Sequence, residues 1–442
     1  MKKKIYNVVK VFVFLLLIVL IYMGLKFVVV DDIDSLTRIT MHELYSLDEN
    51  IDTLLIGPSH TFRGIDAAKI SENSDRNCFA LSTSAQDLAG SYYLLMEADK
   101  ENDIKDVYLE VSPTAISKEI GDETKTYIIT DYMKPSINKY KYLFEVIQPE
   151  YYSNAFFTVC RYTDSLNGAL SIKNWYHNAV KKDSTYWNYA YRGDDTLNYT
   201  GRGHWDSYGN FAEKGAMIKS TSTDIMMNPG VFNEGEISYL NRIVDYCKEN
   251  QLSLHLYVMP FTDLYVACQP TAYDLFVDFV SDYAQQKNIS FMDFNAVSRA
   301  DLALTNDCFK DFDHLNEVGS AIFTDYMMKV LDGKDDYKIY DSAIERIDSE
   351  DRFFGIQYNI EDSDSGKEVM VIPYYNMDNH TFIWEFSLVD KNENLILDTL
   401  PYRKEDEKFY FDISSEYNNM KLWVNAIDEY GNSYYSSYIT VK

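Results

Sequence analysis

Cysteine is scarce in this chain of 442 residues, and no pair of cysteines shares a binding motif. There are five cysteines, an odd number, and none of them forms a C-x-x-C pair. This pattern excludes a disulfide framework and a zinc site of the usual spacing, so we predict no metal and no other cofactor. Cys78 and Cys247 lie in apolar surroundings and are expected to be small core residues.

Positive charge is also in short supply. The chain has 41 Lys and Arg against 69 Asp and Glu, a net charge of −28. Five of the lysines fall in the first 30 residues, so the remainder carries 36 basic against 69 acidic residues, a net charge of −33. An acidic surface of this kind repels polyanions, which argues against a nucleic-acid partner.

One long hydrophobic run is present, near the N-terminus. The segment VFVFLLLIVLIYMGL occupies residues 11–25, between Lys10 and Lys26, and apolar residues continue to Val30. At about 1.5 Å per residue, residues 8–30 are long enough to cross a hydrocarbon core of about 30 Å. No small-x-small cleavage site follows, and three lysines precede the run. We therefore predict a single-pass signal anchor over residues 1–30, with a cytoplasmic N-terminus and an extracytoplasmic remainder. Residues 31–50 are predicted to be a short connector.

The next region alternates between short apolar runs and longer amphipathic stretches. Strands are predicted at 53–56, 78–81, 107–111, 252–259 and 289–294, and helices at 84–100, 237–250, 272–287 and 318–331. Alternating strands and helices indicate βαβ units around a mainly parallel sheet, here over residues 51–335. In such sheets, sites form at the carboxyl ends of the strands.

Residues 117–235 interrupt this pattern with an excess of Tyr, Trp and Asn. We interpret them as an insertion that forms a lid or one wall of a substrate groove. His204 and Trp205 are its candidate substrate-binding residues, because aromatic rings can stack on carbohydrate; packing in the interior is the alternative role.

From residue 349 the sequence changes again. Seven short alternating runs are separated by Asp, Asn, Gly and Ser clusters up to residue 442. This pattern predicts an antiparallel, immunoglobulin-like β-sandwich that serves as a binding or spacer module.

Two segments carry the chemistry. Ser59 follows the first predicted strand on a Gly57-Pro58 turn, and Asp311 and His314 lie three apart before the last predicted helix. Serine catalysis needs a hydroxyl on a tight turn, an imidazole that takes its proton and a carboxylate that orients the imidazole. We predict Ser59 as nucleophile, His314 as base and Asp311 as the orienting group. Asp313 competes with Asp311, but its adjacency to His314 disfavours it.

This layout resembles the SGNH (GDSL-like) hydrolase superfamily over residues 50–335. Gly57-Pro58-Ser59 matches the Gly-Asp-Ser block with Pro in place of Asp, and Asp311-x-x-His314 matches the C-terminal D-x-x-H. The resemblance implies a three-layer α/β/α, flavodoxin-like sheet. With the anchor, the chain is similar to a membrane-bound branch that includes the D-alanyl transfer protein of teichoic-acid modification and polysaccharide O-acetyltransferases.

The chain departs from that family at the oxyanion hole. The Gly and Asn of the family's middle blocks are missing after the second and third strands. Ser59 and Ser84 backbone amides and the Gln86 side chain are the candidate substitutes. Arg63 is a candidate for binding an anionic polymer, with a surface ion pair as the alternative. His60 is expected to point away from Ser59.

The resemblance implies an extracytoplasmic serine esterase or acyltransferase that acts on a cell-envelope polysaccharide or teichoic-acid-like polymer, with a possible membrane-bound acyl-transfer partner. The alternative is a non-catalytic, membrane-tethered glycan-binding or assembly scaffold that keeps a degenerate fold. The missing oxyanion blocks favour the scaffold, whereas the presence of all three triad residue types favours the enzyme.

Overall fold

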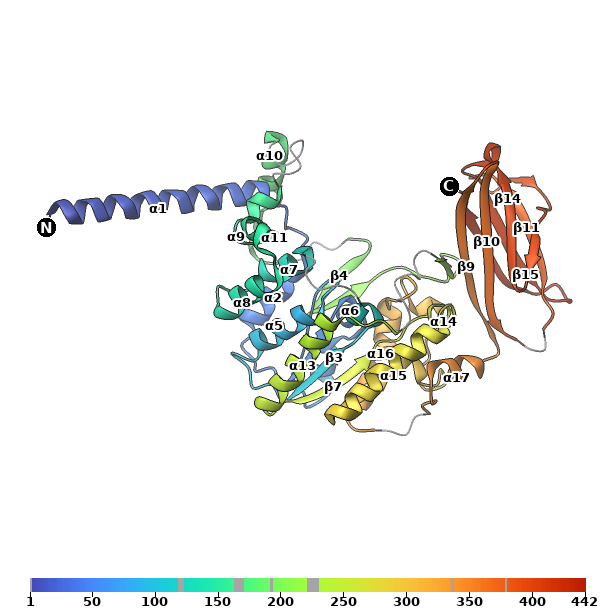
Figure 1. The fold of residues 1–442 in the computed structure, drawn as a ribbon, viewed down its shortest axis with the longest axis horizontal. Helices are drawn as coiled ribbons and strands as arrows, with labels where there is room; N and C mark the ends of the chain where they lie inside the picture. Colours follow the sequence, from blue (N-terminus) through green and yellow to red (C-terminus); the bar gives the residue numbers. More distant parts are fainter. Residues whose placement is uncertain are drawn as a thin grey trace.

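The computed structural model describes residues 2–117, 123–162, 171–190, 194–220, 230–334, 338–377 and 380–442. Figure 1 shows a long N-terminal helix, an α/β body and, at the opposite end, a pair of antiparallel sheets. The chain is thus an α/β protein with antiparallel C-terminal sheets.

A five-stranded parallel sheet forms the centre of the α/β body. Its order is β2-β1-β3-β7-β8, and every neighbouring pair is parallel. The strands are β1 Thr53–Gly57, β2 Cys78–Ser82, β3 Asp106–Glu110, β7 Ser253–Val258 and β8 Ser290–Asp293. All five predicted strands are confirmed, each with its ends within one residue of the prediction.

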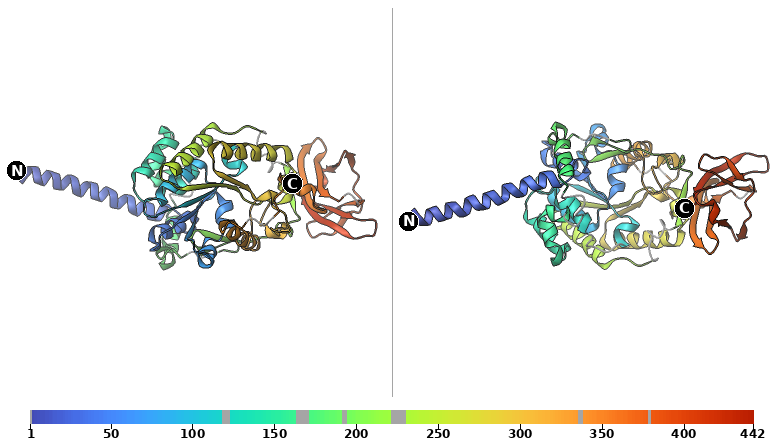
Figure 2. Two further views of the ribbon diagram at one scale, coloured as in Figure 1. Left: turned by 90° about the horizontal axis from the view of Figure 1, so that it is seen from below. Right: turned by 90° about the horizontal axis from the view of Figure 1, so that it is seen from above.

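Helices cover both faces of this sheet (Figure 2). The main helices are α3 Ser59–Gly64, α4 Ala67–Asn73, α5 Leu88–Ala98, α13 Glu234–Glu249, α15 Pro270–Lys287 and α16 Glu317–Leu331. Helices α5 and α13 pack together on one face, and α3, α4 and α16 pack together on the other. The helix predicted from residue 84 begins only at Leu88, because Asp87 is its N-cap and accepts a hydrogen bond from the Gly90 amide at 2.7 Å.

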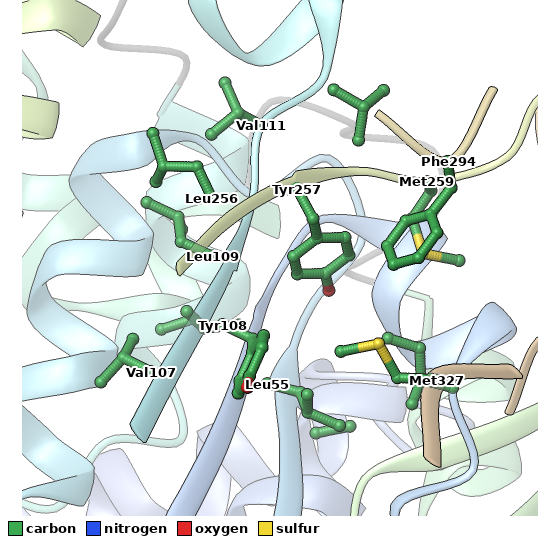
Figure 3. Packing of buried hydrophobic residues seen from close by; sticks show 14 of the residues in the cluster. Leu55, Val107, Tyr108, Leu109, Val111, Leu256, Tyr257, Met259, Phe294 and Met327 are labelled. Carbon is green, nitrogen blue, oxygen red and sulfur yellow. The ribbon is translucent and has the colours of Figure 1, made fainter. Parts of the chain in front are cut away.

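Apolar side chains fill the space between the sheet and its helices (Figure 3). Leu55, Leu109 and Leu256 are at most 1% exposed. Tyr257 is buried beside them, and its hydroxyl lies 3.2 Å from the Thr61 hydroxyl of α3. Contact with the buried Tyr257 therefore holds the first turn of α3, which contains Ser59, in position.

The N-terminal helix α1, Lys2–Val29, is apolar over most of its length, with lysines in its first turn and at positions 10 and 26. Its segment Lys4–Val29 has a mean hydropathy of 2.8, and no residue of its most apolar stretch is buried. These properties fit a membrane span or a signal sequence. Helix α2, Leu36–Ser46, lies in the region predicted as a connector. A partly helical connector was expected here, and Met41 and Leu44 of α2 are buried in the main core.

The predicted insertion supplies small helices and a hairpin; its residues 118–122, 163–170, 191–193 and 221–229 lie outside the described residues. Its elements are α6 Pro113–Ser117, α7 Glu123–Thr130, α8 Ile137–Val146, η1 Pro149–Tyr151, α9 Tyr152–Phe156, η2 Thr158–Tyr162, α10 Ile172–Lys181, α11 Ser184–Trp187, β4 Leu197–Gly201, β5 His204–Ser207 and β6 Met217–Lys219. The β4–β5 hairpin lies against the sheet edge, where the Ala80 amide donates to the Arg202 carbonyl at 2.9 Å. Gly203 has φ +83°, and a Cβ there would lie 1.8 Å from the Ala80 oxygen, so this contact requires glycine.

Two sheets make up the C-terminal region, in the orders β13-β14-β10-β9-β6 and β12-β11-β15-β16. The strands are β9 Arg352–Ser363, β10 Gly366–Asn376, β11 Ile383–Val389, β12 Leu395–Leu397, β13 Arg403–Glu405, β14 Lys408–Ser414, β15 Lys421–Ile427 and β16 Ser433–Thr440. Side chains of both sheets meet in one apolar cluster that includes Val371, Leu388 and Phe411. Strand β13 escaped prediction because its three residues are charged and exposed. Strand β6 comes from the insertion and pairs in parallel with β9.

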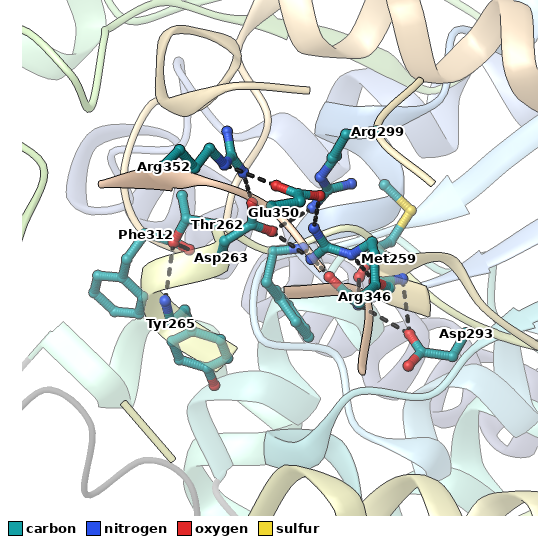
Figure 4. A network of polar contacts seen from close by, with 12 residues as sticks. Met259, Thr262, Asp263, Tyr265, Asp293, Arg299, Phe312, Arg346, Glu350 and Arg352 are labelled. Carbon is teal, nitrogen blue, oxygen red and sulfur yellow. Dashed lines mark hydrogen bonds and ion pairs between the residues drawn. The ribbon is translucent and has the colours of Figure 1, made fainter. Parts of the chain in front are cut away.

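A buried ionic network joins the α/β body to β9 (Figure 4). Arg346 of α17, Ala343–Asp348, is fully buried; it pairs with Asp263 at the start of α14, Asp263–Ala267, and with Glu350 at 2.7 Å. Arg299 also pairs with Asp263, at 2.7 Å. Burial, together with the neighbouring charge of Arg346, lowers the pKa of Arg299 to about 9.

Candidate active site

Ser59 lies where β1 passes into α3, at the carboxyl edge of the sheet. It is the first residue of α3 and is partly exposed, and Pro58 is the N-cap. Gly57 makes the tight turn possible, because a Cβ at this position would lie 2.6 Å from the Thr61 hydroxyl and 2.7 Å from Cβ of Glu110. The lack of a side chain at Gly57 lets α3 begin directly over the end of the sheet.

His314 and Asp311 belong to a closed turn between β8 and α16. The Lys310 amide donates to the His314 carbonyl at 2.9 Å. Asp311 Oδ1 accepts from the His314 amide at 3.0 Å and lies 2.9 Å from His314 Nδ1. The same carboxylate thus shapes the turn and orients the imidazole.

Helix α14 holds this turn in place. The Phe312 carbonyl accepts from the Thr262 hydroxyl at 2.8 Å, and the Phe312 ring stacks on Tyr265 with centroids 5.5 Å apart. Figure 4 shows Thr262 and Phe312 beside the ionic network of Asp263. The position of the turn therefore depends on the junction with β9.

The structure brings the three predicted triad side chains together. Ser59 Oγ lies 2.8 Å from His314 Nε2, although 255 positions separate the two residues in the chain. Because a carboxylate faces Nδ1, the proton of the neutral ring belongs on Nδ1, and Nε2 is free to accept from Ser59. The arrangement is chemically competent to deprotonate the serine hydroxyl.

Asp313 is also part of the site. Its Oδ1 lies 2.8 Å from His314 Nδ1, so the argument that adjacency keeps this carboxylate from the ring is wrong. The closed turn folds residues 311 and 313 onto the same side of the imidazole. His314 is therefore held by two carboxylates.

His60 and Glu110 extend the cluster, and neither was predicted. His60, which was expected to point away from Ser59, has its ring centroid 4.8 Å from that of His314. His60 Nε2 lies 3.6 Å from Asp313 Oδ2, and His60 Nδ1 lies 3.3 Å from Glu110 Oε1. Glu110 ends β3, the neighbour of β1, so the sheet topology places it under His60.

These contacts set the charge of the cluster. Burial disfavours a charged His60, but its hydrogen bonds to Asp313 and Glu110 prevail and raise its pKa to about 10. Burial likewise opposes protonation of His314, yet the charge of Asp313 and the bonds to both aspartates raise the pKa of His314 above its ordinary value. These contacts favour a protonated His60 beside His314, and Asp313 makes the largest contribution that raises the pKa of His314.

This electrostatics predicts a pH dependence. His314 must be neutral to accept a proton, and its pKa is raised above 6.5, so the rate of Ser59 acylation should fall as pH drops through a value above 6.5. Asp313→Asn removes the largest raising contribution and should move this acidic limb to lower pH. The limb is measured from the rate at which a fluorophosphonate phosphonylates Ser59, with loss of fluoride, across pH 5–9, and exposed Asp412→Asn is the control. An unmoved limb would show that Asp313 does not set the pKa of His314.

The oxyanion candidates are placed unevenly. Ser84 lies partly exposed in the turn after β2. The side-chain amide of Gln86 is buried and donates to the Ser91 hydroxyl at 3.0 Å, so it is committed within its own helix start. This burial and this bond disfavour Gln86 as a donor to substrate.

Arg63 lies one turn after Ser59 on α3. Its guanidinium donates to the Ser207 hydroxyl of the hairpin. Burial lowers its pKa, and the charges of Asp311 and Asp313 partly offset this effect. Arg63 is thus a half-buried cation near the carboxylates of Asp311 and Asp313.

His204 and Trp205 are interior residues, each 1% exposed. The His204 ring bonds to the hydroxyls of Thr200 at 2.7 Å and Ser320 at 3.0 Å, and the Trp205 indole donates to the Thr40 hydroxyl at 3.3 Å. Neither side chain can stack on a glycan in this structure. Their predicted substrate-binding role is wrong, and they join the hairpin to α2 and α16.

His60, Asp313 and His314 are near enough to share a cation, since their donor atoms lie within 4.8 Å of one another. The His314 nitrogens, however, already face Ser59 on one side and two carboxylates on the other. The hydrogen-bond geometry is that of a proton relay, in which His314 links Ser59 to the two aspartates.

Comparison with solved structures finds distant likenesses. No protein-family model and no curated protein matches the chain. It is similar to a Bacteroides fragilis protein provisionally described as an acylhydrolase, with 9% identity and a TM-score of 0.30 over 66% of this chain and 94% of that one. An engineered protein shows 11% identity and a TM-score of 0.15 over 93% of this chain and 98% of its own. Likenesses at these scores carry no weight for function, which must be inferred from the site.

Proposed function

We propose that this chain is a membrane-anchored, extracytoplasmic serine esterase or O-acyltransferase that acts on acyl esters of a cell-envelope glycopolymer. The observation that carries the proposal is the continuous relay from Ser59 Oγ to His314 Nε2 at 2.8 Å and from His314 Nδ1 to Asp311 at 2.9 Å. Its position at the carboxyl edge of a parallel sheet is where such sites form.

The reaction proceeds in two balanced steps. Ser59 Oγ attacks the ester carbonyl while its proton passes to His314 Nε2, and Asp311 and Asp313 stabilise the imidazolium. The imidazolium then gives this proton to the leaving alcohol, which leaves an acyl-Ser59. In the second step, water or a polymer hydroxyl attacks the acyl carbonyl and loses its proton to His314. The bond from the acyl carbon to Ser59 Oγ then breaks, Ser59 takes this proton from His314, and the free acid or the acylated polymer leaves.

Negative charge on the carbonyl oxygen must be stabilised in both steps. Amides in the first turn of a helix have no carbonyl partner within that helix, and Ser59 is the first residue of α3. We therefore assign the Ser59 amide as one oxyanion donor and the turn at Ser84 as the source of a second.

The proposed membrane anchor supports a cell-envelope polymer as the substrate. A catalytic body tethered by α1 acts where envelope polymers and membrane-bound acyl donors are found. Arg63, beside the triad, would bind an anionic segment of such a polymer by its guanidinium.

The test uses the full chain in detergent with an O-acylated teichoic-acid-type polymer as donor. Free acid and acyl groups transferred to a second, unacylated polymer are measured by mass spectrometry. We expect either product from wild type and from His255→Ala, whose histidine lies on β7 away from the triad and bonds to Ser290. His314→Ala should lower the yield about 10³-fold. A wild-type yield equal to buffer would contradict the proposed substrate.

A further inference from the structure

The C-terminal end of α1 is hydrogen-bonded to the globular part of the protein. The Asn178 side chain of α10 donates to the carbonyls of Val28 at 3.0 Å and Val29 at 3.3 Å. Lys182 donates to the carbonyls of Phe27 at 3.0 Å and Val30 at 2.6 Å. These bonds satisfy the last carbonyls of α1, so the helix and the body form one unit rather than a tether and a free domain.

Further contacts involve α1 residues that precede its C-terminal end. The Thr158 amide donates to the Tyr22 hydroxyl at 3.0 Å, and the rings of Phe157 and Tyr22 lie 5.9 Å apart. Trp187 stacks on Phe27 with centroids 6.0 Å apart. Tyr22 precedes the end of the helix by seven residues, or about 10 Å at 1.5 Å per residue. If α1 spans a membrane, the segment around Phe157 and Thr158, which contacts Tyr22, therefore lies at the membrane surface.

The helices around this end expose apolar side chains. Figures 1 and 2 show α8, α9 and α10 at the end of the body from which α1 emerges. On α10, Ile172, Tyr176 and Val180 follow one another at four-residue spacing and are 79%, 72% and 57% exposed. Such spacing places them on one helical face. Ile137 and Phe144 of α8 and Phe157 before η2 are exposed in the same way.

The charge of this segment is opposite to that of the chain. Residues 134–182 contain seven Lys and Arg against three Asp and Glu, in a protein with a net charge of −28. Three of the seven, Arg161, Lys181 and Lys182, pair with Asp131, Asp31 and Asp32. Exposed apolar side chains interleaved with lysines are typical of helices that lie in the interface of an anionic membrane.

We propose that α8, α9 and α10 lie in the extracytoplasmic leaflet, with their apolar side chains among the acyl chains and the exposed Lys141 and Lys173 at anionic headgroups. This inference goes beyond the proposed function; it rests on the anchoring of α1 and not on the serine chemistry. The body is then seated on the bilayer in one orientation, and its C-terminal sheets, at the opposite end, point away from the membrane (Figure 1).

The test places a benzoyl-phenylalanine photocrosslinker in the full chain at one of four positions. These are Tyr176 of α10, Phe144 of α8, Val13 within α1, and Tyr430, which is 82% exposed in the C-terminal sheets. Each protein is reconstituted in phosphatidylglycerol–phosphatidylcholine vesicles and irradiated, and lipid adducts are quantified by mass spectrometry. Circular dichroism and the tryptophan emission confirm that each variant is folded.

We expect lipid adducts at Val13, Tyr176 and Phe144 that exceed those at Tyr430 by about fivefold or more. Adducts at Val13 alone would overturn the proposal while leaving the anchor intact, and no adduct at Val13 would overturn the anchoring on which it rests. In native membranes, crosslinking of Tyr176 to a protein in place of lipid would also overturn it. None of these results depends on esterase or acyltransferase activity, so they test the membrane contact independently of the serine chemistry.

Discussion

Ser59→Ala is expected to lower kcat/KM for hydrolysis of an activated acyl ester by about 10⁴-fold. The hydroxyl that lies 2.8 Å from His314 Nε2 is the group that forms the acyl bond, and no neighbouring side chain in the described cluster offers another nucleophile in its place. The rate is measured with p-nitrophenyl acetate on the full chain in detergent. Ser415→Ala, at an exposed position of the C-terminal sheets, is the matched control and should stay within about twofold of wild type.

The same variant separates the enzyme from the scaffold. A glycan-binding scaffold would keep its polymer binding and its cellular phenotype after Ser59→Ala, because a single oxygen atom is removed from a partly exposed turn. An enzyme would lose the phenotype with unchanged folding. Retention of both activity and phenotype in Ser59→Ala would contradict the proposed function.

Arg346→Ala is expected to lower the free energy of unfolding by about 3 kcal/mol or more, because it breaks a buried ionic network. Arg346 is fully buried, and it donates to the Asn295 carbonyl at 2.6 Å and to Glu350 at 2.7 Å. Its loss leaves these acceptors without that partner and opens a cavity at the junction with β9. Denaturant titration followed by tryptophan fluorescence measures the change.

Arg403→Ala is the control for this experiment. Its ion pairs with Glu368 and Glu405 lie on the surface, where such pairs contribute at most about 1 kcal/mol. Equal stability of the two variants would show that the Arg346 network does not hold the junction together.

The sequence predicted the frame of the site better than its surroundings. Apolar runs between turn residues located all five parallel strands, and the D-x-x-H spacing located the turn that holds His314, because both signals are local. His60 and Glu110 could not be found in this way, since they meet only after β1 and β3 pair. One signal was available: both residues lie at the carboxyl ends of strands, where side chains converge.

Aromatic content was a poor guide to function. The run at His204 and Trp205 suggested a glycan surface, but the hairpin packs against the sheet edge and buries both side chains. Conversely, the exposed apolar face of α10 was not predicted, because the short sequence IKNWYHNAVK has no strong boundary signals and its meaning depends on its contacts with α1.

The most direct test of the central claim is reaction of the full chain with a fluorophosphonate probe, with the adduct mapped by mass spectrometry. An activated serine at the start of α3 predicts one adduct, on Ser59, which His314→Ala abolishes and His255→Ala leaves in place. No adduct on folded wild-type protein, or an adduct on Ser59 that persists in His314→Ala, would contradict an imidazole-activated nucleophile.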